Sequence, residues 1–128
     1  MLQSRMPRRN PNIARLRQHV RDLCKHHRIT VYRCRRSQQA CAQRESKQIA
    51  IPPIKSAKTY ATAMHELGHV LGHHQDSRRV MVRERWAWNW ARANALTWPP
   101  NIERVVARDL TWYAAHAAKL DRRAAQQD

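Results

Sequence analysis

The sequence predicts an α+β fold: one small domain in which a helix precedes a short β-sheet and three further helices follow. Four segments carry apolar residues at helical spacing, and two short segments rich in β-branched or aliphatic residues lie between the first and second of them. A chain of 128 residues suits one domain with a modest core, and it contains no internal repeat and no long linker.

The chain begins with a basic lead, residues 1–9, which we expect to be disordered. A helix is predicted from Pro11 to about His26, because Asn10 can cap the first turn and proline suits the first helical position. Apolar residues recur at helical spacing inside this segment and predict the face that packs on the core: Ile13, Leu16, Val20 and Leu23.

Two short strands are predicted after this helix. Residues 29–34 are rich in β-branched side chains, and residues 48–51 form a second run that Pro52 and Pro53 close, because proline donates no ladder hydrogen bond. The polar residues 35–47 between them are expected to form a turn or an irregular loop. An exposed edge of such a sheet can bind an extended peptide through main-chain hydrogen bonds, or the sheet can simply cover the helices.

The next predicted helix carries the most specific pattern in the chain. It begins at Ser56 as N-cap, ends near Gly72 and contains the sequence H-E-L-G-H at residues 65–69. Two histidines four residues apart lie on one helical face, separated by about 6 Å of rise, so both imidazoles can bind one tetrahedral zinc ion. We therefore expect His65 and His69 to bind one Zn²⁺ per chain; the other interpretation is a histidine pair without metal.

Glu66, between the two histidines, indicates chemistry as well as metal binding. A carboxylate beside a zinc-bound water can take its proton, and a purely structural zinc site would not need one. We expect Glu66 to be the general base of a hydrolytic reaction.

A catalytic zinc ion usually has three protein ligands and one open position. His73 would lie about 12 Å further along a straight helix than His65, so it can join the site only where the helix breaks at Gly72. His73 and the adjacent His74 are therefore kept as backup ligands.

Glu84 is the favoured third ligand. It lies in a helix predicted from about Val80 to Leu96, in which Ala87 and Ala91 are small enough to allow a close approach to the glycines of the zinc helix. A carboxylate at this position can reach the metal; the alternative is a solvated surface glutamate.

A final helix is predicted from about Pro100 to Ala118, with Ile102, Val105 and Leu110 at core spacing. The domain is accordingly expected to span residues 10–120, with residues 121–128 as a frayed tail. Because the chain has five tryptophans and no phenylalanine, the tryptophans are expected mainly as large core residues.

The composition is strongly basic, with 25 Lys and Arg against 9 Asp and Glu and a net charge of +16. Such a charge favours nucleic acid or an acidic protein as partner, in a salt-dependent manner. The arginines are spread through every segment, however, and no zinc-finger, RNA-binding or basic-zipper pattern occurs. We expect nucleic-acid contact only as a secondary property.

Three cysteines, an odd number, are not spaced as a metal-binding pair, and the sequence contains no signal-peptide pattern and no apolar run that could cross a membrane. Reduced thiols, a cytoplasmic location and no membrane partner are therefore expected.

Residues 65–73, followed by E-R-W-A-W-N-W-A at residues 84–91, resemble the ImmA/IrrE family of zinc metallo-endopeptidases, which carry H-E-x-x-H and later E-x-x-A-x-x-F-A. The resemblance covers roughly residues 11–98 and implies a zincin-like domain. It also implies zinc bound by His65, His69 and Glu84, with Glu66 as catalytic base. Trp90 stands where the family has phenylalanine, and we expect no helix-turn-helix repressor domain beside the predicted domain.

The family includes proteins of phages and mobile elements that cleave or antagonise repressors, and regulators of stress responses, so the resemblance implies a regulatory or repressor protein as substrate. A phage or prophage origin is expected from the small size and basic composition. The metallopeptidase half of the ArdC antirestriction proteins is similar over less of the chain. A different zinc peptidase family carries a third histidine where this sequence has Gln75.

The sequence thus predicts a zinc-dependent metallopeptidase that hydrolyses peptide bonds in a protein or peptide substrate. Four residues are candidates to stabilise the oxyanion of the reaction: His73, His74, Tyr60 and Tyr113. The alternative is a non-catalytic, zinc-stabilised basic protein that binds DNA or an acidic protein, and a third interpretation is a helical protein that binds no metal.

Overall fold

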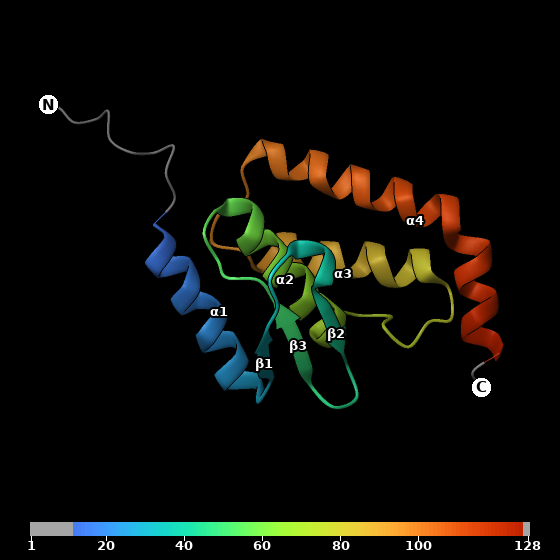
Figure 1. The fold of residues 1–128 in the computed structure, drawn as a ribbon, viewed down its shortest axis with the longest axis horizontal. Helices are drawn as coiled ribbons and strands as arrows, with labels where there is room; N and C mark the ends of the chain where they lie inside the picture. Colours follow the sequence, from blue (N-terminus) through green and yellow to red (C-terminus); the bar gives the residue numbers. More distant parts are fainter. Residues whose placement is uncertain (1–11, 127–128) are drawn as a thin grey trace, which may run out of the picture.

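The computed structural model describes residues 12–126, and the basic lead at residues 1–9 lies outside this range. The described part is an α+β domain, the class that the sequence predicts. Figure 1 shows its elements in chain order: α1 (Ile13–His27), β1 (Thr30–Arg33), a 3₁₀ turn (Ser37–Gln39), β2 (Cys41–Gln43), β3 (Gln48–Ile51), α2 (Ala57–Leu71), α3 (Val80–Asn94) and α4 (Pro100–Gln126).

Helix α1 begins after Asn12, whose side chain accepts a hydrogen bond from the backbone N–H of Arg15. The expected cap, Asn10, lies outside the described residues. The helix ends at Arg28, which adopts a left-handed conformation with φ 57°. The buried face follows the predicted spacing and consists of Leu16, Val20 and Cys24.

The sheet has the strand order β1–β3–β2, with β1 parallel and β2 antiparallel to the central strand β3. Residues 35–47 were predicted as an irregular loop, and this prediction is wrong for residues 41–43, which form β2. They are a strand because their backbone pairs with β3, Cys41 opposite Ala50 and Gln43 opposite Gln48. This pairing leaves β2 as an outer strand of the sheet.

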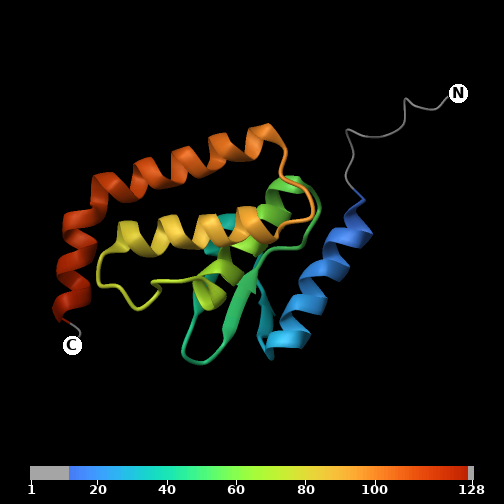
Figure 2. The same ribbon diagram turned by 180° about the vertical axis from the view of Figure 1, so that it is seen from behind.

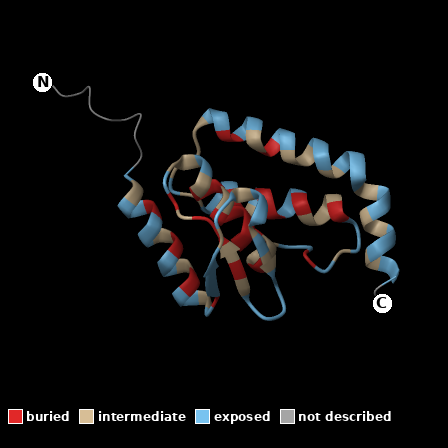
Figure 3. Ribbon diagram, in the orientation of Figure 1, coloured by how far each residue is buried: buried red, intermediate tan, exposed pale blue. Residues whose placement is uncertain are grey.

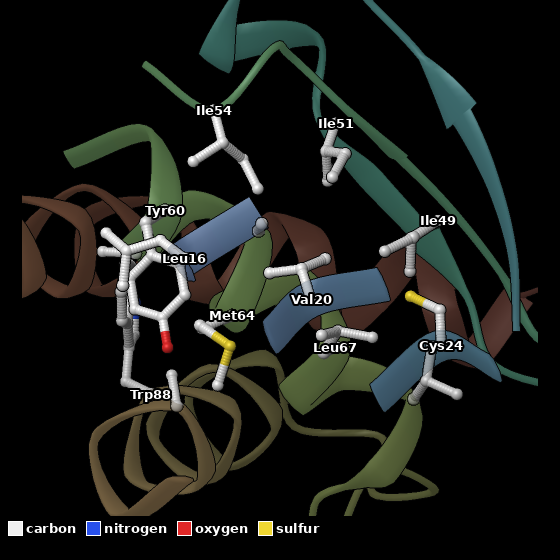
Figure 4. Close-up of a cluster of buried hydrophobic side chains, with 14 of the residues drawn as sticks. Leu16, Val20, Cys24, Ile49, Ile51, Ile54, Tyr60, Met64, Leu67 and Trp88 are labelled. Atoms are coloured by element: carbon white, nitrogen blue, oxygen red, sulfur yellow. The ribbon is translucent and has the colours of Figure 1, made fainter. Parts of the chain in front are cut away.

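The core lies where one face of the sheet meets α1 and α2. Ile49 and Ile51 are two residues apart in β3 and therefore point to the same face. Figure 4 shows them beside Val20 and Cys24 of α1, with Leu67 of α2 close by. Helix α2 is the most buried element and lies between the sheet, α1 and α3, as the coloured ribbon of Figure 3 shows.

Helices α2 and α3 approach each other unusually closely. A Cβ atom added to Gly68 would lie 2.3 Å from the carbonyl oxygen of Ala87, so only glycine fits at this point of α2. The chain has two glycines, and the second, Gly72, ends the same helix. Ser56 caps its start as predicted and accepts a hydrogen bond from the backbone of Thr59.

Helix α4 continues to Gln126, beyond the predicted end at Ala118. Residues 121–126, expected to be frayed, are therefore helical, whereas residues 127–128 lie outside the described range. Asp121 gives this extension a function in the fold, because its Oδ1 accepts a hydrogen bond of 2.8 Å from the first backbone N–H of α3, at Val80. Figure 2 shows the last turns of α4 beside the start of α3.

Two smaller differences concern α3 and the tryptophans. Helix α3 ends at Asn94, two residues before the predicted end. Of the five tryptophans, all within the described range, Trp88 is buried in the core and two others, Trp90 and Trp98, are partly buried against it. The remaining two, Trp86 and Trp112, are exposed, so the expectation of tryptophans as core residues is wrong for these two. Among the described helices, none combines the length and the apolar character that crossing a membrane requires.

Candidate metal centre

Helices α2 and α3 bring three metal-binding side chains together. His65 and His69 come from adjacent turns of α2, and Glu84 comes from α3, one turn before the residue that contacts Gly68. One ligand atom from each of the three lies within 4.8 Å of the others. His65 and Glu84 are buried, and His69 is partly buried. The close contact between α2 and α3 therefore sets the distance from the Glu84 carboxylate to the two histidines.

The carboxylate of Glu84 bridges the two imidazoles. Its Oε1 lies 3.0 Å from Nε2 of His65, and its Oε2 lies 2.8 Å from Nε2 of His69. Burial alone would raise the pKa of Glu84, but its hydrogen bonds to the two histidines lower that pKa to about 2. The site therefore holds an ionised carboxylate.

His65 shows the complementary effect. Burial alone would lower its pKa, but the hydrogen bonds with Glu66 and Glu84 and the charges of these two carboxylates raise it to about 9. The surroundings of His65 thus favour a positive charge on its imidazole, which a proton or a metal cation can supply.

Gln75 fixes the orientation of the second histidine. Its side-chain nitrogen donates to the carbonyl oxygens of His73, at 3.2 Å, and Arg83, at 2.9 Å. Its Oε1 therefore faces Nδ1 of His69 at 2.9 Å, and because an amide oxygen only accepts, Nδ1 must carry the proton. In a neutral His69, Nε2 then directs a lone pair at an oxygen of Glu84. Nε2 of His69 and Oε2 of Glu84 lie 2.8 Å apart, a hydrogen-bond distance that a proton between them satisfies; a metal ion in place of that proton would find both atoms available as ligands.

Trp88 covers the first histidine. Its ring stacks on His65 with the centroids 4.0 Å apart and the planes inclined by 10°. The indole N–H donates to Oδ2 of Asp109 in α4 at 2.7 Å, which fixes the plane against which the imidazole rests. One face of His65 is thereby shielded from water.

Two of the three candidate ligands, His65 and His69, border a cavity of about 350 Å³ that Glu66 also lines, and the buried Glu84 lies behind the two histidines. An oxygen of Glu66 lies 3.6 Å from Nδ1 of His65. The wall opposite α2 is formed by β2 and the adjoining turn, and the remaining wall by α3, α4 and the loop before α3; these contribute Ala40, Cys41, Ala42, Arg44, Gln75, Arg83 and Tyr113.

Tyr113 is the one oxyanion candidate that borders this cavity. Burial raises the pKa of its hydroxyl, and the negative charges of Glu84, Asp109 and Glu66 act in the same direction. The phenol therefore keeps its proton at neutral pH and can donate a hydrogen bond into the cavity.

Tyr60 does not line the cavity, which corrects its prediction as an oxyanion-stabilising residue. It is fully buried, and its hydroxyl has two partners, Nδ1 of His19 at 2.7 Å and the backbone N–H of Leu96 at 2.9 Å. This hydroxyl links α1 and the segment that follows α3 to α2.

His73 and His74 also lie apart from the three converging ligands. Both follow the helix end at Gly72, are exposed, and have ring contacts with Trp86, with the His74 and Trp86 centroids 4.7 Å apart. The helix does break at Gly72, but the chain turns away from the site, so neither histidine acts as a backup ligand in this arrangement.

Sequence reasoning missed Gln75 and Asp109 as neighbours of the site. Gln75 was noted only as a departure from a three-histidine motif, although its place six residues after His69 was the available signal. Asp109 is one of six acidic residues after Glu66, and no local pattern distinguishes it from the others.

Comparisons with known proteins add no relative: no protein-family model matches the chain, and neither does a curated protein or a solved structure. The resemblance to the ImmA/IrrE peptidases therefore rests on the two short motifs at residues 65–73 and 84–91.

Proposed function

We propose that the chain is a zinc-dependent metallopeptidase, a hydrolase of peptide bonds, with His65, His69 and Glu84 as zinc ligands. The observation that carries the proposal is the convergence of these three side chains beside a cavity that His65, His69 and Glu66 line. Two imidazoles and a carboxylate form a ligand set typical of catalytic zinc, and they leave one coordination position open.

Each residue has a distinct role in this proposal. Zinc, when bound, would polarise the scissile carbonyl group and lower the pKa of water. Glu66 accepts a proton from the attacking water and passes it to the leaving amine. Tyr113, protonated at neutral pH, is the favoured donor to the oxyanion. Gln75 and Trp88 hold the two histidine rings in position.

The outer strand β2 supports a peptide as substrate. Cys41 and Ala42 of this strand line the cavity, and β2 pairs with β3 on one side only. An extended peptide can bind along such an edge through main-chain hydrogen bonds, which places a peptide bond near the zinc ligands. The motif resemblance supports a regulatory or repressor protein as the substrate, in the cytoplasm.

The net charge of +16 favours a second candidate function, a zinc-stabilised basic protein that binds DNA or an acidic protein without catalysis. The position of Glu66 argues against it, because a structural zinc site has no use for a carboxylate beside its ligands.

The substitution Glu66→Gln tests the proposal. We expect the variant to retain one zinc per chain, measured by elemental mass spectrometry, and to lose peptide hydrolysis by a factor of about 10² or more, measured by mass spectrometry of a peptide mixture. Asp22→Asn, an exposed acid on α1, is the matched control and should keep full activity. Full activity of Glu66→Gln would contradict the assigned role. Zinc without any hydrolysis by the unaltered protein, together with salt-dependent DNA binding, would favour the second candidate.

A further inference from the structure

Two arginines from different parts of the chain border the cavity that His65, Glu66 and His69 line. Arg44 lies in the turn between β2 and β3, and Arg83 lies in the first turn of α3, directly before Glu84. Arg44 and Gln75 also border a second hollow of about 630 Å³, so the two hollows adjoin along the turn after β2. The cavity thus continues into a longer cleft.

Neither arginine is neutralised by an acidic residue of the described chain. Arg83 is partly buried, and its Nη1 donates to the carbonyl oxygen of Ser77 at 2.6 Å. Within residues 12–126, Arg44 and Arg83 form no ion pair with an aspartate or glutamate. A guanidinium group has five N–H donors in a planar fork, so Arg83 keeps donors for a planar anion such as a carboxylate.

The acidic groups nearby do not cancel this preference. Glu84 and Glu66 both face imidazole nitrogens, and a divalent zinc ion would offset their charges. Glu45 and Asp76 border the adjoining hollow beside Arg44 and weaken the field there. Of the two arginines, Arg83 is therefore the stronger determinant of what binds next to the metal.

We propose that Arg83, assisted by Arg44, binds a carboxylate of the substrate peptide next to the zinc ligands. This inference rests on the proposed peptidase function and specifies its substrate class: a peptide with an aspartate or glutamate near the scissile bond, or one whose C-terminal carboxylate lies there. Both sources present the same chemistry to a guanidinium group.

The test measures binding separately from hydrolysis. The zinc-loaded Glu66→Gln protein is titrated with fluorescent nine-residue peptides in which one aspartate or its asparagine match occupies each position in turn, with either a free or an amidated C-terminus. We expect at least one carboxylate-bearing peptide to bind about tenfold more tightly than its uncharged match. A difference between aspartate and asparagine identifies a side chain, and a difference between free and amidated ends identifies the C-terminus.

Single substitutions in the same protein locate the preference. Arg83→Gln should remove most of it, and Arg44→Gln should remove a smaller part. Arg83→Lys, which keeps the charge but not the planar fork, should retain an intermediate preference and guards against misfolding of the glutamine variant. Arg85→Gln is the matched control, because Arg85 lies on the same helix, is exposed and does not border the cavity; it should change nothing.

Three results would overturn the inference: equal binding of carboxylate-bearing and uncharged peptides, absence of peptide binding, or an equal loss of preference in the Arg85→Gln and Arg83→Gln variants. The proposed function fails separately, if the unaltered zinc-loaded protein binds the acidic peptides and hydrolyses none of them. Hydrolysis without any carboxylate preference would contradict this inference alone.

Discussion

The buried amide of Gln75 accepts the Nδ1 proton of His69 and leaves Nε2 of that ring for a metal ion. Gln75→Ala removes this acceptor and should lower zinc affinity about tenfold to a hundredfold, the usual effect of losing such a partner. The affinity is measured by competition with a chromophoric chelator. Gln18→Ala, an exposed glutamine on α1, is the control and should bind zinc as the unaltered protein does. An affinity unchanged by Gln75→Ala would contradict the role given to this amide.

At the same scale, the sequence predicted some site residues well and others poorly. The spacing of His65, Glu66 and His69 is local, so one helix is enough to bring the histidines onto a shared face. Glu84 was found because the small residues beside it indicated which face of its helix meets α2. Tyr60 was misplaced because helical spacing does not say where a long side chain ends, and its hydroxyl lies with His19, away from the cavity.

The contact between α2 and α3 carries the element-scale prediction. In an exposed helix, replacing glycine by alanine stabilises by about 1 kcal/mol. At Gly68 the added methyl group would meet the backbone of Ala87 at 2.3 Å, so one helix must move. We expect Gly68→Ala to destabilise the protein by about 1–3 kcal/mol, measured by chemical unfolding of the metal-free protein. A Gly68→Ala variant more stable than the unaltered protein would contradict this prediction, because it would show that α2 and α3 move apart without loss of stability.

The same substitution should weaken zinc binding. Glu84 lies one turn before Ala87, so displacing α3 moves the carboxylate away from the two histidines. The matched measurement is zinc affinity in Gly68→Ala under conditions where the protein remains folded. Undiminished affinity in a folded, destabilised variant would mean that the contact stabilises the fold without positioning the ligand.

The elements themselves differ in how far the sequence could predict them. Helix α2 was predicted from apolar spacing and a capping serine, both of which are signals within the segment. Strand β2 was missed because its three residues become a strand only by pairing with β3, which no local pattern reveals. The end of α4 was set too early because Asp121 is held by the start of α3, 41 residues away in the chain.

Across the whole molecule, the candidate metal centre connects elements that are distant in sequence. Helix α2 provides two ligands and α3 the third, while Asp109 of α4 supports Trp88 and through it the ring of His65. Because the unfolded chain does not hold these groups together, binding energy at the site should appear as stability of the fold. The net charge of +16 opposes compaction through the repulsion of like charges, and the free energy of metal binding would offset part of this destabilisation.

Removing the metal should therefore destabilise the entire domain. A ligand that binds only the folded state at about a thousand times its Kd adds about 4 kcal/mol, which corresponds to a rise in Tm of roughly 10 °C or more for a chain of this size. Thermal unfolding is followed with zinc and with a chelator. His69→Ala should show little or no zinc-dependent rise, and magnesium should not replace zinc, because it prefers oxygen ligands. Equal Tm values with zinc and with chelator in the unaltered protein would contradict a zinc-linked fold. A rise that His69→Ala fully retains would place the stabilising zinc at another position, since His69 contributes one of the three converging ligand atoms.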